Sequence, residues 1–174
     1  MDSFSQHCRQ EADTAALAQR FSEILGQFLI AKPSSHINIS LEGDLGAGKT
    51  TFARYLIQGI GYVGRVKSPT YTLCELYPLI LVSRHKKVVV TAHHFDLYRM
   101  RSPLEWQEAG FSEYFDLPGF CLIEWPEKAD GTLPPFDVQI QLSAGMDDEA
   151  RDLTFTARTD QGIQILAMFA PTTL

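Results

Sequence analysis

Eight consecutive residues have the types and spacing that bind phosphate: Gly43-Asp44-Leu45-Gly46-Ala47-Gly48-Lys49-Thr50. They match the pattern G-x-x-x-x-G-K-T, in which glycines let successive backbone N–H groups point inward around a phosphate. The lysine of this pattern reaches the β- and γ-phosphates, and the hydroxyl that follows it is placed to ligate Mg²⁺. We therefore predict that residues 43–50, together with Thr51, bind a nucleoside triphosphate, with Lys49 on phosphate and Thr50 on the metal.

Two carboxylates follow apolar strands and are candidates for the same site. Asp96 ends the apolar run 88–95, and Glu124 ends the run 120–123. Ligands of parallel sheets gather outside the carboxyl ends of the strands, so both side chains are expected to face residues 43–50, which we call the phosphate loop. Asp96 fits a carboxylate near Mg²⁺, or alternatively a cap for the turn that follows it. Glu124 fits a metal ligand or a group that orients water, or alternatively a surface carboxylate before a proline turn.

The loop at 62–71 supplies one more candidate, Thr70. Its hydroxyl can meet Mg²⁺ or the terminal phosphate, because phosphate-loop enzymes often place a γ-phosphate sensor after the first helix. A plain turn-forming role for Thr70 stays open. His93 and His94 do not predict a metal site, because neighbouring residues on a strand face opposite sides of the sheet.

The spacing of apolar residues predicts the strands and helices that position these residues. Strands are predicted at 37–41, 71–76, 88–95, 120–123, 137–142 and 151–157, and helices at 11–30, 51–58 and 102–110 with a further turn at 111–115. Residues 161–169 form a closing helix or strand, and the basic run 84–87 a solvated hairpin tip. We expect one α/β domain over 1–174, a P-loop NTPase-type three-layer sandwich with a mixed central sheet and helices on both faces, frayed at about 1–10 and 171–174.

Charge and composition limit the kinds of binding partner and the cellular locations that the chain can be expected to have. The net charge of −6 argues against a broad nucleic-acid footprint, so any nucleic acid is expected to be met through another protein. We find no membrane-spanning run and no secretory signal at the N-terminus. The three cysteines lie far apart without a C-x-x-C motif and fit buried thiols in a reducing cytosol, which favours a cytoplasmic location.

Other phosphate-loop classes fit less well. A GTPase would need a D-x-x-G and an N-K-x-D motif, but the segments 116–119 and 127–130 are too close together, and Glu127 lacks the amide of asparagine. A small-molecule kinase remains the alternative, with Arg99 and Arg101 as candidate lid arginines. A binding module that holds ATP without hydrolysing it is a further class, which phosphate release on mixing with partners would separate from an ATPase.

Four blocks in one order resemble the TsaE family, also called YjeE. They are the phosphate loop with Thr51-Phe52, then Ser68-Pro69-Thr70-Tyr71-Thr72-Leu73, His94-Phe95-Asp96-Leu97-Tyr98-Arg99 and Glu124-Trp125-Pro126. The resemblance implies a bacterial cytoplasmic ATPase of low intrinsic rate, needed to make threonylcarbamoyladenosine in tRNA. It also implies TsaD and TsaB as protein partners, with tRNA reached indirectly through them and TsaC supplying threonylcarbamoyl-adenylate.

The resemblance also implies roles for single residues, with ATP and Mg²⁺ as cofactors. Lys49 would hold phosphate, Thr50 and Glu124 would bind Mg²⁺, and Thr70 and Asp96 would support the γ-phosphate end. Thr14, on the predicted first helix, and Arg151, on a late strand, match the segments that lie near the adenine.

Overall fold

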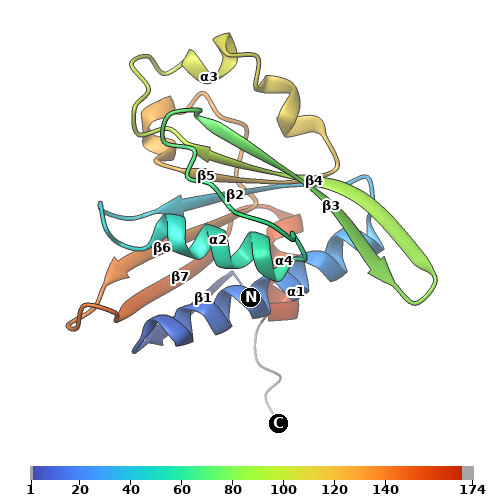
Figure 1. Cartoon of the computed structure of the whole chain (residues 1–174), viewed down its shortest axis with the longest axis horizontal. Helices are drawn as coiled ribbons and strands as arrows, with labels where there is room; N and C mark the ends of the chain where they lie inside the picture. The colour runs from blue at the N-terminus through green and yellow to red at the C-terminus, as the bar shows by residue number, and fades with distance from the viewer. Residues whose placement is uncertain (1, 170–174) are drawn as a thin grey trace.

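The computed structural model describes residues 2–169, which form one mixed sheet with helices on both faces (Figure 1). Its strands are β1 (Ser3–Cys8), β2 (His36–Glu42), β3 (Cys74–Ser83), β4 (Lys86–Asp96), β5 (Gly119–Glu124), β6 (Val138–Ala144) and β7 (Arg151–Ala157). Its α-helices are α1 (Glu11–Ala31), α2 (Lys49–Gly59), α3 (Glu105–Glu108) and α4 (Asp160–Phe169), and two 3₁₀ helices are η1 (Ser112–Asp116) and η2 (Pro126–Ala129).

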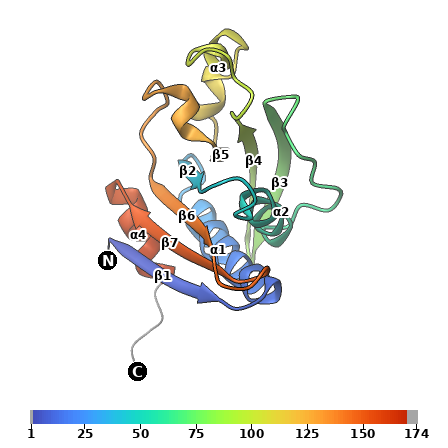
Figure 2. The same cartoon turned by 90° about the vertical axis from the view of Figure 1, so that its left-hand side faces the viewer.

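The strand order is β1-β7-β6-β2-β5-β4-β3. The four central strands, β6, β2, β5 and β4, are parallel, whereas β1, β7 and β3 pair antiparallel with their neighbours. Figure 2 shows β1 and β7 at one side of this sheet and the β3–β4 hairpin at the other. The predicted α/β class with a mixed sheet is therefore confirmed, and the parallel centre brings the carboxyl ends of β2, β5 and β4 to one edge.

Each face of the sheet carries its own apolar cluster. Helices α1, α2 and α4 cover one face, where Phe21, Phe52 and Phe155 are fully buried. The second cluster is smaller and lies under the short helices α3, η1 and η2, with Trp106 and Phe115 inside it. Both faces of the parallel strands are therefore covered, which is why β5 is buried along its whole length.

The N-terminal residues differ from the prediction. Residues 3–8 are not frayed but form β1, which pairs with β7 from Ser3 opposite Thr156 to Cys8 opposite Arg151. The pairing satisfies the outer hydrogen-bonding groups of β7, and the ring of Phe4 packs against those of Phe155 and Phe169. The predicted fraying of 171–174 lies outside the described residues.

The structure shifts the bounds of some predicted elements and settles the type of others. β3 starts at Cys74 and extends to Ser83, later than the predicted 71–76, and the helix predicted at 102–110 is confined to Glu105–Glu108. Residues 161–169 fall in helix α4, and the basic run 84–87 is the solvated end of the β3–β4 hairpin, as expected. Among residues 2–169, no helix combines the length and apolarity that a membrane crossing requires.

Candidate functional site

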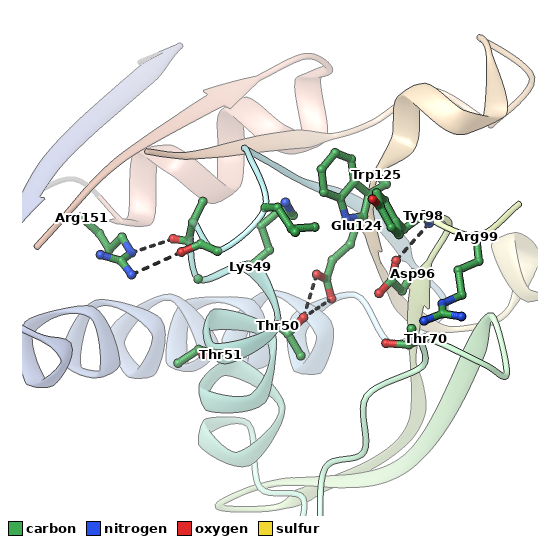
Figure 3. Close-up of a pocket in the computed structure, with 14 residues that line it drawn as sticks. Lys49, Thr50, Thr51, Thr70, Asp96, Tyr98, Arg99, Glu124, Trp125 and Arg151 are labelled. Carbon is green, nitrogen blue, oxygen red and sulfur yellow. Dashed lines mark hydrogen bonds between the residues drawn. The ribbon is translucent and has the colours of Figure 1, made fainter. Parts of the chain in front are cut away.

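A cleft of about 450 Å³ opens at the carboxyl edge of the parallel strands. Its lining comes from the phosphate loop, the start of α2, the ends of β4 and β5, Thr70 and Arg151 (Figure 3). Strand register explains the convergence, because Glu124 lies opposite both Leu41 of β2 and Asp96 of β4. Predicted residues from five separate segments thus share one cavity: the phosphate loop, Thr70, Asp96, Glu124 and Arg151.

The phosphate loop has the backbone that its glycines allow. Gly43 leaves β2 with a φ of 151°, and a Cβ at this position would lie 2.3 Å from the carbonyl oxygen of Leu142 on β6. Gly48, with a φ of 99°, is the N-cap of α2 and offers no side-chain cap to the first N–H groups of that helix. Such N–H groups at a helix start favour an anion.

Lys49 lies inside the loop and is almost fully buried. Its Nζ donates to the backbone carbonyls of Gly43 and Asp44, the latter at 3.1 Å. Burial lowers the pKa of Lys49 from its ordinary value, while the carboxylates of Glu124, Glu127, Asp96 and Asp44 act in the opposite direction. A phosphate at these groups would favour the charged ammonium.

Glu124 joins the loop to the sheet. The Thr50 hydroxyl donates to its carboxylate at 2.8 Å from Oε1 and 3.1 Å from Oε2, as Figure 3 shows. Glu124 is only 2% exposed, so the alternative of a surface carboxylate is wrong. This hydroxyl–carboxylate pair is what a Mg²⁺ site beside a phosphate loop requires.

Asp96 and Thr70 lie on the side of Glu124 away from Lys49 and Thr50 (Figure 3). The backbone N–H of Tyr98 donates to Asp96 Oδ1 at 3.0 Å, so Asp96 does cap the turn after β4 and lines the cleft at the same time. Burial raises the pKa of Asp96 above its usual value, and the Tyr98 N–H partly offsets this. The Thr70 hydroxyl hydrogen-bonds Ser68 Oγ at 2.7 Å and lines the cleft, so its role as γ-phosphate sensor stays a prediction.

Thr14 and Arg151 meet in an adjoining hollow of about 150 Å³. Gly48 and Thr51 line both cavities, so the hollow continues the cleft beyond the phosphate loop. Arg151, however, is engaged with backbone. Its Nε donates to the carbonyl of Ala47 at 2.9 Å, and its other nitrogens donate to the carbonyls of Gly46, Asp148 and Ala150. Arg151 therefore braces the phosphate loop, and adenine contact by either residue stays a prediction.

Three further side chains line the cleft, Tyr98, Arg99 and Trp125, and the sequence had singled out only Arg99 among them, as a candidate lid arginine. The ring of Trp125 covers Lys49 Nζ, 3.9 Å from the ring centroid, and packs against Tyr98. Trp125 reaches this place because its φ is 58°, at the start of η2. Arg99 lines the cleft with its guanidinium over the ring of Tyr71. An aromatic residue directly after a strand-end carboxylate was the signal available for Trp125.

The donor set fits Mg²⁺ bound with a nucleotide. Residues 2–169 contain no cluster of three or more His, Cys, Asp or Glu side chains suited to a metal. Mg²⁺ in phosphate sites usually takes one or two protein oxygens, with phosphates and waters as the other ligands. Thr50 Oγ1 and the Glu124 carboxylate supply such oxygens. His93 and His94 face opposite sides of β4, as predicted, since His93 stacks on Tyr114 and His94 contacts Glu124.

Comparison with known proteins gives a consistent result. Residues 8–153 match the family model described as "Threonylcarbamoyl adenosine biosynthesis protein TsaE". The tRNA threonylcarbamoyladenosine biosynthesis protein TsaE of Haemophilus influenzae is 39% identical over 170 residues, 98% of this chain and 99% of that protein. The TsaE protein of Bacillus subtilis is 40% identical over 127 residues, 73% of this chain and 72% of that protein.

A solved structure extends the comparison to the fold. The crystal structure of YdiB from Bacillus subtilis superposes with a TM-score of 0.70 and 28% sequence identity, covering 96% of this chain and 93% of that one.

Proposed function

Because this chain belongs to the TsaE family of tRNA threonylcarbamoyladenosine biosynthesis, we propose that it is a Mg²⁺-dependent ATPase that binds a TsaB–TsaD transferase and resets it through ATP binding and hydrolysis. The observation that carries the proposal is the convergence of Lys49, Thr50 and Glu124 in one cleft, with Thr50 Oγ1 2.8 Å from Glu124 Oε1.

The chain's own groups would act through position and charge. The N–H groups at the start of α2 and the Lys49 ammonium would stabilise the negative charge that the β- and γ-oxygens of a bound triphosphate gain as the terminal bond lengthens. Thr50 and Glu124 would hold Mg²⁺, which when bound neutralises part of that charge. Asp96 and Thr70, beyond Glu124, would face the terminal phosphate and its attacking water.

The adenosine would extend past Gly48 toward the hollow at Thr14. This direction follows from the shared lining of the two cavities, since Thr51 and Arg151 contribute to both. Arg151 would act there by holding the carbonyls of Gly46 and Ala47 and thus the curvature of the loop.

A partner is expected to complete the site. The cleft is open to solvent, and the phosphate-loop residues 44–46 are exposed, so groups from another protein can reach the nucleotide. A positive group supplied in trans typically raises such hydrolysis rates by about 10³ to 10⁵. The net charge of −6 suits a chain that leaves tRNA binding to its partners.

Reconstitution tests the proposal. The chain is combined with TsaB, TsaD, threonylcarbamoyl-adenylate and tRNA, with ATP or with its non-hydrolysable β,γ-imido analogue, and modified tRNA and released phosphate are counted. We expect several rounds of modification per transferase with ATP, about one round with the analogue, and a faster release of phosphate in the presence of the partners.

Two results would contradict the proposal. An ATPase rate unchanged by TsaB and TsaD, with no complex on gel filtration, would exclude the reset. Transfer of the terminal phosphate to a small molecule without the partners would instead support a kinase.

A further inference from the structure

The carboxylate of Glu124 has two hydrogen-bond partners. Thr50 at the start of α2 donates to it, nearer to Oε1 (2.8 Å) than to Oε2 (3.1 Å), and His94 on β4 has its Nε2 2.6 Å from Oε2. His94 is fully buried and Glu124 almost so. The strand register brings them together, because His94 pairs with Leu122, two residues before Glu124 on β5.

The direction of this hydrogen bond follows from the chemistry of the two groups. A carboxylate that binds Mg²⁺ is ionised and only accepts, so in that state His94 Nε2 carries the proton and donates to Glu124. The other ring nitrogen, Nδ1, is buried without a hydrogen-bond partner among residues 2–169. The polar interaction of this imidazole is therefore directed at one carboxylate oxygen.

The neighbouring His93 provides the contrast. It is also buried, but neither of its ring nitrogens has a hydrogen-bond partner in the described part of the chain. Its ring stacks on Tyr114, with centroids 4.3 Å apart, on the opposite face of the sheet. His93 thus fills space in the smaller apolar cluster, whereas His94 orients a polar group of the cleft.

We propose that His94 is a positioning residue for Glu124, fixing the carboxylate so that Oε1 is presented to Thr50 and to Mg²⁺; this rests on the nucleotide site proposed above. With Oε2 held by His94, the carboxylate cannot rotate without breaking a buried, charge-assisted hydrogen bond. Partners that orient a metal-binding side chain commonly change metal affinity by about 10- to 100-fold when they are replaced.

Four variants separate this role from packing. A glutamine amide extends as far as the imidazole Nε2, whereas an asparagine amide reaches only as far as Nδ1. His94→Gln is therefore expected to keep the bond to Glu124, and His94→Asn and His94→Leu to lose it. His93→Leu is the matched control, because it removes an equally buried imidazole from the adjacent position. Circular dichroism and thermal unfolding establish which variants are folded.

The measurement is the Mg²⁺ concentration that gives half-maximal tight binding of the β,γ-imido ATP analogue, followed by calorimetry. We expect this concentration to rise about 10- to 100-fold in His94→Asn and His94→Leu. His94→Gln and His93→Leu should stay close to wild type, and Mg²⁺-free binding of the analogue should be similar in every folded variant.

The results that would contradict these expectations distinguish failure of the nucleotide site from failure of the role of His94. Wild-type protein that shows no Mg²⁺-dependent binding would overturn the proposed nucleotide site and this role with it. Normal Mg²⁺ dependence in wild type and in His94→Asn would overturn only the role of His94. A His94→Gln variant that is unfolded, or as impaired as His94→Asn, would also overturn it, so the glutamine–asparagine pair decides the matter even where His94→Leu does not fold.

Discussion

Gly43→Ala tests where the phosphate loop packs. The added methyl group would lie 2.3 Å from the carbonyl oxygen of Leu142 and 3.1 Å from the Cβ of Ala47. The first contact is with the backbone of β6, which cannot move aside as a flexible side chain can. Gly61→Ala is the matched control, because Gly61 also has a positive φ, 114°, but a Cβ there would meet no atom within 4 Å.

The difference between the two variants isolates the steric contact. A residue other than glycine in these sparsely populated φ regions costs about 1–3 kcal/mol, and both variants carry this cost. Overpacking adds about 1–3 kcal/mol more, in Gly43→Ala alone. We therefore expect Gly43→Ala to lose about 2–6 kcal/mol of unfolding free energy, a large share of the 5–15 kcal/mol typical of a domain.

Urea unfolding of both variants, without nucleotide, measures these losses, and calorimetric titration with Mg²⁺-ATP reports the effect on binding. Gly43→Ala should also bind ATP more weakly than Gly61→Ala, because the Gly43 carbonyl is a partner of Lys49. Equal unfolding free energies for the two variants would refute the packing of the loop against Leu142.

Three further predictions concern the cleft and the core. Arg151→Met removes the hydrogen bonds to the carbonyls of Gly46 and Ala47. The Kd of this variant for ATP, measured by calorimetry, should rise about 10- to 150-fold, which is the equivalent of one charged hydrogen bond. An unchanged Kd would show that Arg151 does not hold the loop in its binding conformation. Thr50→Val, which cannot donate to Glu124, should raise the Mg²⁺ requirement of ATP binding but leave Mg²⁺-free binding intact; a normal requirement would remove Thr50 from the metal site. Burial, assisted by His36, lowers the pKa of His93 from 6.5 to about 4, so the unfolded chain binds a proton there that the native chain does not. Urea unfolding should therefore show that the contribution of His93 lowers the free energy of unfolding by about 3 kcal/mol from pH 6.5 to 4, and His93→Leu should make this fall shallower. An equal fall in wild type and His93→Leu would contradict the lowered pKa of His93.

Local patterns in the sequence were sufficient to predict that the loop at 43–50 and the carboxylates of Asp96 and Glu124 meet at one cleft. The loop is a contiguous motif, and Asp96 and Glu124 each end an apolar strand, so parallel pairing alone brings them to the same edge. The α/β class followed from the same alternation of strands and helices and is confirmed.

Contacts between distant segments could not be predicted in this way. β1 pairs with β7 across almost the whole chain, and no periodicity within residues 3–8 indicates that partner. The bond from His94 to Glu124 depends on the register of β4 against β5, which the sequence does not reveal. The position of Trp125 over Lys49 depends on a backbone with a φ of 58°, which is uncommon for any residue but glycine.

Binding of the triphosphate by Lys49 is tested directly by calorimetric titration of ATP with Mg²⁺ into wild type and Lys49→Met. Two unit charges about 4 Å apart near a protein surface attract by about 4 kcal/mol, so loss of the ammonium should weaken binding by about 1,000-fold. We predict one saturable site in wild type and no measurable heat in a folded Lys49→Met protein. Equal binding by both proteins, or no heat from wild type, would contradict it.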